Sequence, residues 1–257
     1  MDTLCTDKTG TLTEAKIKLE RHINLSGQIS ERVLELAYLN SFFETGLKSP
    51  LDEAILDHGE IDISLWSKVD EVPFDFERRR VSVLLDHSEK KNRTLVVKGA
   101  PEEIIRLCTN YETEKGTIQT IDIEAIEKIH SVYTSLEKEG FRVLGIAWRE
   151  ESMDHTHAVV SDESELILSG FAAFLDPPKE SAKLALSSLN EIGITVKIIT
   201  GDSELVTEHV CSELNIPILG VLTGKEIDSI DDSALRIKVE STNLFCRMNP
   251  SQKTELF

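Results

Sequence analysis

The stretch Asp7-Lys8-Thr9-Gly10-Thr11-Leu12-Thr13 places a carboxylate, a glycine turn and threonines directly after a short run, Met1 to Thr6, that predicts a buried strand. Such a carboxylate suits a nucleophile toward phosphorus, because it is ionised near neutral pH and needs no general base. Its charge must be offset as it approaches a phosphate, and backbone N–H groups around Gly10, a Mg2+ ion and a nearby lysine would do so. An ordinary solvated turn aspartate is the alternative, and seven specified positions argue against it.

Length and charge narrow the class of protein. The chain has 257 residues, enough for two domains that each bury a core. Its formal net charge of -18 argues against binding to nucleic acid or to anionic membrane surfaces. No apolar run approaches the roughly 18 residues needed to span a bilayer, and no signal peptide is evident, so we expect a soluble, monomeric polypeptide.

The four cysteines are far apart and lie among apolar neighbours. They show no paired spacing, so neither a zinc site nor a disulfide is expected. We expect reduced, buried thiols at Cys5, Cys108, Cys211 and Cys246.

The C-terminal part of the chain alternates between patterns typical of helices and strands, which predicts the α/β class with a doubly wound parallel sheet. Such sheets bind ligands at the carboxyl ends of their strands, where Asp7, Thr200 and Asp202 would lie. The expected strands are Met1–Thr6, Ile194–Ile199, Ile218–Leu222 and Leu244–Arg247. Three helices are expected: one over 179–192, one that contains Val206, Val210 and Leu214 on one side, and one over 232–240. The first of them has an apolar face formed by Ala182, Ala185, Leu186 and Leu189.

The segment 15–174 has a different pattern and reads as a second domain inserted into the first. Val81–Leu85 and Leu95–Val97 flank a polar stretch, which predicts an antiparallel hairpin. Further strands are expected at 141–148 and 166–174, with an amphipathic helix over 123–139. The product would be an α+β domain with an antiparallel sheet. The polar stretch 150–165 reads as a mobile surface loop.

The chain contains three further motifs: Lys98-Gly99-Ala100-Pro101-Glu102, Asp176-Pro177-Pro178-Lys179 and Thr200-Gly201-Asp202. Together with Asp7–Thr13 they resemble, in their residues, order and separations, the motifs of P-type ATPases, the ion pumps that form an aspartyl-phosphate. The resemblance covers the whole chain. Finer features at 51–56, 74–80 and 200–205 look most like bacterial magnesium-transporting members.

The resemblance implies a haloacid-dehalogenase-like phosphorylation domain at 1–14 and 175–257, interrupted by a nucleotide-binding domain at 15–174. Asp7 would accept the γ-phosphate of ATP, and the Asp7 carboxylate and Thr9 carbonyl would bind Mg2+. The remaining implied roles are phosphate contacts for Thr9, Thr11, Thr200, Gly201 and Lys253, and loop orientation for Asp202. An N-cap role for Asp202 and a surface role for Lys253 are the alternatives.

The nucleotide site is also implied by the resemblance. Phe74 would stack on adenine, Lys98 and Gly99 would line the pocket, and Asp52 would lie near the base. Gly99 lacks a side chain, which leaves room for a ligand. Arg142 would lie near the β-phosphate and Arg79 near the phosphates. Core packing is the alternative for Phe74, and a solvated face is the alternative for Arg78-Arg79-Arg80.

Thr9 bears on a rival function. Soluble phosphatases of the same fold carry an acid–base aspartate two residues after the nucleophile, and this chain has a threonine there, which would prolong the life of the aspartyl-phosphate. A stand-alone phosphatase and a catalytically silent nucleotide-sensing module remain the alternatives.

The resemblance further implies transmembrane and actuator domains elsewhere in the full-length chain. It also implies that the present part lies at the cytoplasmic face of the inner membrane. The chain ends before the family's last Mg2+ loop, so we expect it to bind ATP or ADP but to transfer phosphate slowly.

Overall fold

The structure, a computed structural model, describes residues 2–14, 16–46 and 48–255. The predicted boundaries at Met1, Ala15 and Phe257 lie outside these residues. The chain divides into two compact units. Unit 1 comprises Met1–Ile17, Glu137–Arg142 and Leu175–Phe257, and unit 2 comprises Lys18–Leu136 and Val143–Phe174. Across the described part of the chain, no helix is both long and apolar enough to cross a membrane.

Unit 1 contains a parallel sheet with the strand order β1-β10-β12-β11 in the described residues. Its apolar side chains alternate between two clusters, with Ile198 and Leu244 in one and Ile199 and Phe245 in the other. Because successive residues of a strand point to opposite faces, β10 and β12 pack against apolar side chains on both faces. The strands are β1 (Thr3–Asp7), β10 (Thr195–Ile199), β11 (Val221–Thr223) and β12 (Leu244–Cys246).

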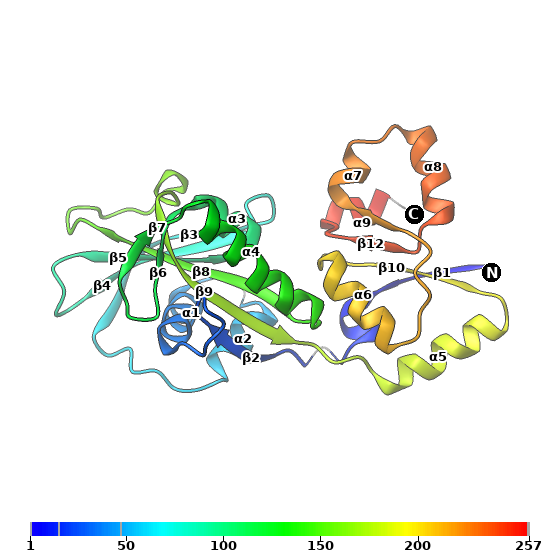
Figure 1. Cartoon of the computed structure of the whole chain (residues 1–257), viewed down its shortest axis with the longest axis horizontal. Coiled ribbons are helices and arrows are strands. Elements are labelled where there is room, and N and C mark those ends of the chain that lie inside the picture. Colours follow the sequence, from blue (N-terminus) through cyan, green and yellow to red (C-terminus); the bar gives the residue numbers. More distant parts are fainter. Residues whose placement is uncertain (1, 15, 47, 256–257) are drawn as a thin grey trace. The chain divides into compact units, whose positions relative to one another are not determined.

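The helices of unit 1 lie between and after these strands, as Figure 1 shows in yellow to red. In the predicted helix at 179–192, Ala182 is buried and Leu186 packs against the core, whereas Ala185 is exposed. The elements are the π-type turn η1 (Lys8–Leu12) and the helices α5 (Glu180–Glu191), α6 (Glu204–Glu213), α7 (Gly224–Asp228), α8 (Asp232–Ser241) and α9 (Pro250–Glu255).

Two strand predictions in unit 1 need correction. The first strand is not buried: Thr3, Cys5 and Asp7 are exposed because β1 pairs only with β10 and forms an edge of the described sheet. The strand expected at Ile218–Leu222 begins only at Val221, because the Asn243 side chain instead accepts the Leu219 N–H at 2.9 Å. Cys5 was predicted to be buried, but it is exposed because it lies on this edge strand.

Unit 2 is built on a larger mixed sheet, in which eight strands are described. The path β3-β4-β5-β8-β9-β6-β7 is continuous, and β2 pairs with β9. Pairing is antiparallel from β3 to β8 and parallel between β6 and β9. The strands are β2 (Lys18–Ile23), β3 (Trp66–Asp75), β4 (Arg80–His87), β5 (Arg93–Gly99), β6 (Cys108–Glu112), β7 (Ile118–Thr120), β8 (Arg142–Glu151) and β9 (Leu166–Leu175).

The hairpin predicted from Val81–Leu85 and Leu95–Val97 is confirmed by the antiparallel pairing of β4 with β5. The long helix predicted over 123–139 is present as α4 (Ile123–Lys138), with Ile129 and Leu136 buried. The other helices of this unit are α1 (Glu31–Phe43), α2 (Pro50–Leu56) and α3 (Pro101–Leu107), and Val160–Asp162 forms the 3-10 turn η2. The interpretation of 150–165 as a surface loop is wrong at Glu163, which is fully buried.

Candidate functional site

Asp7 stands at the carboxyl end of β1, opposite Ile199 of β10. Its side chain is half exposed, and one carboxylate oxygen accepts the N–H of Lys8 at 2.8 Å. The other accepts a hydrogen bond from Lys253 Nζ at 3.1 Å, which offsets part of its charge. Two residues predicted for one site, 246 positions apart, are therefore in contact.

The turn after Asp7 is held by the motif Asp176-Pro177-Pro178-Lys179. Gly10 adopts a φ of 78°, a left-handed conformation that favours glycine, and its N–H donates to Thr13 Oγ1 at 3.2 Å. Thr13 Oγ1 in turn donates to Asp176 Oδ2 at 2.6 Å, and Lys179 Nζ donates to the Gly10 carbonyl at 2.5 Å. Asp176 and Lys179 therefore fix the loop that begins at the proposed nucleophile.

Asp202 follows β10 and forms the centre of a buried ion cluster. Lys8 Nζ lies 2.5 Å from Asp202 Oδ2, and Arg142 Nε lies 2.9 Å from Asp202 Oδ1. Burial by itself would raise the pKa of Asp202, but Arg142 and Lys8 hold this pKa below its ordinary value. Asp202 is thus an anion with two cationic partners, and Ser203, not Asp202, is the N-cap residue of α6.

The sequence reasoning did not assign Lys8, although it lies next to the nucleophile within the quoted motif. Its side chain is 1% exposed. Thr200 is also buried, and its Oγ1 accepts the Asp202 N–H at 3.2 Å. Of the other predicted phosphate contacts, Thr9 is half-buried, and Thr11 and Gly201 are exposed.

In unit 2, Lys98 and Asp52 meet in a second buried ion cluster. Lys98 Nζ pairs with Asp52, lies 3.2 Å from Glu44 Oε2 and donates to Ser41 Oγ at 2.7 Å. Burial would raise the pKa of Asp52, but Lys98, Ser49 and Ser41 lower it below its usual value, whereas burial raises the pKa of Glu44. The sequence predicted Lys98 and Asp52 but missed Glu44 and Ser41, which have no recognisable motif.

Phe74 lies near the end of β3 and is 50% exposed, so core packing does not explain it. Its ring meets that of Phe76, itself 66% exposed, edge to face with centroids 5.2 Å apart. An aromatic pair open to solvent is a surface on which a planar base can stack.

The basic triplet beside this pair does not form one solvated face. Arg79 adopts a φ of 52° and pairs with Glu102 at 2.7 Å, while Arg80 is buried. The expectation that Gly99 leaves room for a ligand is wrong: a Cβ there would lie 2.5 Å from the Arg79 carbonyl oxygen. Gly99 is required instead by the close approach of β4 to β5.

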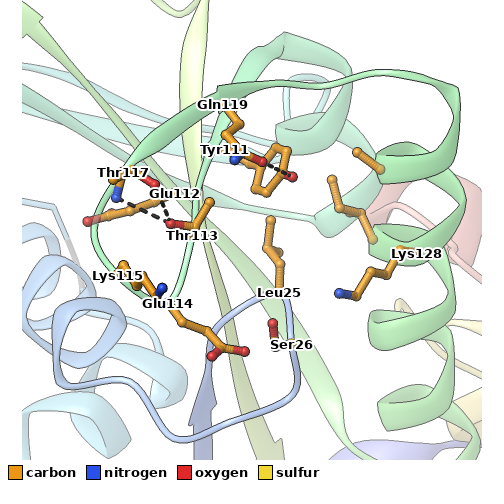
Figure 2. Close-up of a pocket in the computed structure, with 12 residues that line it drawn as sticks. Leu25, Ser26, Tyr111, Glu112, Thr113, Glu114, Lys115, Thr117, Gln119 and Lys128 are labelled. Atoms are coloured by element: carbon orange, nitrogen blue, oxygen red, sulfur yellow. Dashed lines mark hydrogen bonds between the residues drawn. The ribbon is translucent and has the colours of Figure 1, made fainter.

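A pocket of about 330 Å3 lies elsewhere in unit 2, between the β6–β7 hairpin, the loop at Leu25 and α4. Figure 2 shows Lys128 of α4 opposite Glu114 and Lys115 of the hairpin. Of the residues that the structure describes, none that was predicted to bind nucleotide lines this pocket. Likewise, no group of three or more His, Cys, Asp or Glu side chains arranged for a metal ion is found among them.

A family model described as P-type ATPase, cytoplasmic domain N, matches residues 35–181, which is more than half of the chain. The chain belongs to the P-type ATPase family. This confirms the family predicted from the four motifs.

Among its relatives is the magnesium-transporting ATPase, P-type 1, of Escherichia coli K12, which is 44% identical over 100% of this P-type ATPase chain. The protein of the same name from Salmonella typhimurium is 43% identical, again over 100% of the chain. Calcium-transporting ATPase 1 of Lactococcus lactis is 27% identical over 98% of the chain. The chain spans 29% of the length of the two magnesium relatives and 31% of the calcium relative.

Proposed function

We propose that this chain is the ATP-binding and aspartyl-phosphate-forming part of a cation-transporting P-type ATPase, with magnesium as the transported ion. The observation that carries the proposal is the match to cytoplasmic domain N over residues 35–181. The identity of 44% to a magnesium-transporting relative, against 27% to a calcium-transporting one, favours magnesium.

The proposed division assigns residues 15–174 to the nucleotide-binding domain and residues 1–14 and 175–257 to a haloacid-dehalogenase-like phosphorylation domain. A parallel sheet whose inner strands are covered on both faces, with Asp7 at the end of its first strand, supports the second assignment. Transmembrane and actuator domains would lie in the rest of the full-length protein, which would place this part at the cytoplasmic face of the inner membrane.

In the proposed reaction an oxygen of Asp7 attacks the γ-phosphorus of ATP. A bond forms between that oxygen and phosphorus, the bond from phosphorus to the β,γ-bridging oxygen breaks, and ADP leaves with the electron pair. Lys253, which already contacts Asp7 at 3.1 Å, would stabilise negative charge on the transferred group. Lys8 and Arg142 keep Asp202 anionic beside Thr200, which would fix the loop that holds the phosphate.

Mg2+ suits the donors that are present. Its preferred ligands are oxygens, and it is held in proteins by one or two carboxylates together with phosphate oxygens and water. The Asp7 carboxylate and the Thr9 carbonyl would hold it, and the ion would neutralise charge on the phosphates. Thr9 also separates the proposal from the phosphatase alternative, because a threonine cannot act as the acid–base catalyst that those enzymes carry there.

ATP binding is tested by titrating the chain with ATP and with ADP and comparing Phe74→Ala with the wild type. Loss of an aromatic contact worth about 0.5–1.5 kcal/mol should weaken both ligands about two- to twelvefold, and equally. Leu65→Ala is the matched control, since Leu65 is 42% exposed and precedes the same strand at its other end. Unchanged affinity in a folded Phe74→Ala protein would place the base elsewhere.

A further inference from the structure

The exposed aromatic pair lies at the end of β3 and in the turn that follows it, and the two rings are not held in place by burial. Phe74 and Phe76 are 50% and 66% exposed. Within the turn, Asp75 Oδ1 accepts the N–H groups of Glu77 and Arg78 at 2.9 and 2.8 Å. In addition to the β3–β4 pairing of Asp75 with Arg80, polar contacts to the rest of unit 2 therefore hold the segment that presents the rings.

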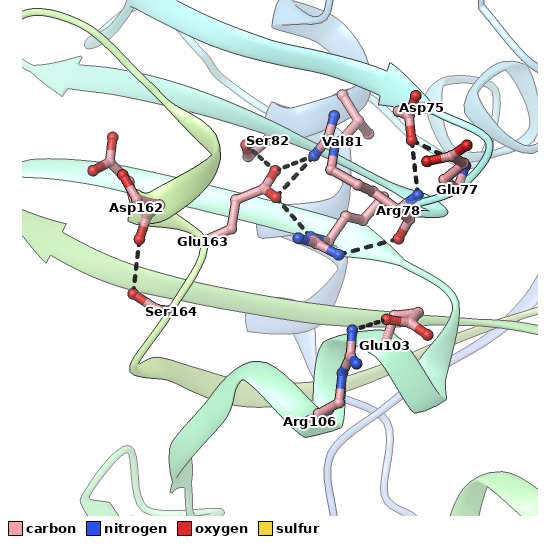
Figure 3. A network of polar contacts seen from close by, with 12 residues as sticks. Asp75, Glu77, Arg78, Val81, Ser82, Glu103, Arg106, Asp162, Glu163 and Ser164 are labelled. Atoms are coloured by element: carbon pink, nitrogen blue, oxygen red, sulfur yellow. Dashed lines mark hydrogen bonds and ion pairs between the residues drawn. The ribbon is translucent and has the colours of Figure 1, made fainter.

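Glu163 supplies such an anchor. Its side chain is completely buried, yet it is a carboxylate that accepts four hydrogen bonds. Arg78 Nη1 lies 2.8 Å from both of its oxygens, Arg80 Nε donates to Oε2 at 2.6 Å, and Ser82 Oγ donates to Oε1 at 2.8 Å. Figure 3 shows the carboxylate pointing at Ser82 and at the end of Arg78.

Arg78 and Arg80 connect the Glu163 carboxylate to the backbone of the turn. Arg78 Nη2 donates to the carbonyl of Pro73 at 2.5 Å, and Pro73 immediately precedes Phe74. Arg80 Nη1 donates to the carbonyl of Arg78 at 3.2 Å, on the other side of the turn. A guanidinium presents several N–H groups in a fixed plane, so each arginine joins the carboxylate to the turn backbone rigidly.

Glu163 is itself held in place from the sheet. Arg149 of β8 donates to the carbonyl of Asp162 at 3.2 Å and to that of Ser164 at 2.9 Å, the residues on either side. The Asp162 carboxylate accepts the Val159 N–H at 2.8 Å and so closes the preceding turn. The position of the Glu163 carboxylate is therefore fixed by the sheet. In the sequence it lies 85 positions from Arg78 and 83 positions from Arg80, the two arginines that it binds.

We propose that Glu163 is a positioning residue for base stacking: through Arg78 and Arg80 it holds the turn that presents Phe74. This inference rests on the proposed function, in which Phe74 stacks on the adenine of ATP. Glu163 would touch no ligand, and its effect on binding would pass entirely through the orientation of the aromatic ring.

The test is ATP titration of Glu163→Gln, with Glu165→Gln as the matched control. Glu165 is exposed and lies two positions away, so the control makes the same chemical change without disturbing the anchor. We expect Glu163→Gln to weaken ATP about three- to tenfold, close to the effect of Phe74→Ala, and Glu165→Gln to leave affinity unchanged. All titrations are made at a temperature at which circular dichroism shows each variant folded.

The double variant Phe74→Ala with Glu163→Gln separates positioning from general destabilisation. If Glu163 acts only through the ring, the second change should add no further loss once the ring is gone, whereas independent effects would multiply. Should Glu163→Gln fail to fold, Arg78→Lys replaces it, because lysine keeps the charge but cannot bond Pro73 and Glu163 through one planar fork.

The outcomes are distinct. Wild-type affinity in Glu163→Gln, or in Arg78→Lys where that variant replaces it, together with a loss in Phe74→Ala, overturns the inference and leaves the proposed function standing. Equal losses in the presence and absence of Phe74 also overturn it, since they would show a general structural effect. Wild-type affinity in Phe74→Ala overturns both the proposed base contact and the inference.

Discussion

Replacing Lys98 by methionine should destabilise unit 2 strongly, and in a manner that depends on pH. The side chains of Lys98, Glu44 and Asp52 are 5%, 7% and 5% exposed, and one lysine balances two carboxylates. Methionine has a similar length and fills the space, so the main loss is the buried positive charge. Removing one partner of a buried ion pair costs about 3–5 kcal/mol, and we expect a loss of that size at pH 7.5.

The sign of the pH dependence follows from the two carboxyls that are left. Without Lys98, the folded-state pKa of Asp52 should rise above its unfolded value and the pKa of Glu44, which burial already raises, should rise further, because burial and mutual repulsion both oppose ionisation. A group with a raised folded pKa stabilises the fold at low pH and loses this effect as pH rises through the folded pKa. The variant should therefore recover part of its lost stability between pH 7.5 and 5.5, while Lys48 moderates the effect at Glu44.

Urea unfolding followed by tryptophan fluorescence measures this effect, because Trp66 and Trp148 both belong to unit 2. Lys91→Met is the control, since Lys91 is exposed in the β4–β5 hairpin and its loss should change stability by less than about 0.5 kcal/mol. A loss below about 1 kcal/mol in Lys98→Met, or a loss that is the same at both pH values, would refute the reasoning.

Two other predictions concern cysteine reactivity and packing. Burial raises the pKa of all four thiols, but it raises those of Cys108, Cys211 and Cys246 to about 12, and Cys5 alone among them is exposed. A thiol reagent at pH 8 should therefore label Cys5 first, as mass spectrometry can show, and simultaneous labelling of all four would contradict this. Gly170→Ala should destabilise unit 2 by about 2 kcal/mol or more, because the new Cβ would lie 2.0 Å from the Ile23 carbonyl oxygen. Gly59→Ala, which meets nothing within 4 Å, is the control for urea unfolding, and equal stability of the two variants would show that β2 moves aside freely.

Much of the fold and part of the candidate site followed from local sequence. The strand end at Asp7, the glycine turn and the loop at Thr200 are encoded within a few residues each, and Figure 1 shows the alternating elements that the C-terminal pattern predicted. Lys253 followed only from the resemblance to the family, because its local sequence by itself indicates a surface lysine. Its Nζ lies 3.1 Å from Asp7 Oδ2, and its contact with a phosphate stays a prediction.

Long-range pairing is what the sequence could not show. The stretch containing Glu163 is rich in acidic residues, serine and histidine, a composition that ordinarily faces solvent. Its burial depends on partners far away in the sequence: Arg78 in the turn after β3, and Arg80 and Ser82 in β4. Glu44 was missed for the same reason, because its partner Lys98 lies 54 positions away. The exposure of Cys5 depends on the position of β1 at a sheet edge, which the apolar character of its neighbours does not reveal.

Whether Asp7 carries the phosphoryl group decides the proposed function. The measurement is hydroxylamine-sensitive label from γ-labelled ATP, after acid quench, on the full-length P-type ATPase that we propose contains this chain. We predict label in the wild type and in Asp2→Asn, an exposed acid near the other end of β1, and none in Asp7→Asn. Label that persists in Asp7→Asn, or label in the wild type that resists hydroxylamine, would show that Asp7 is not the acceptor.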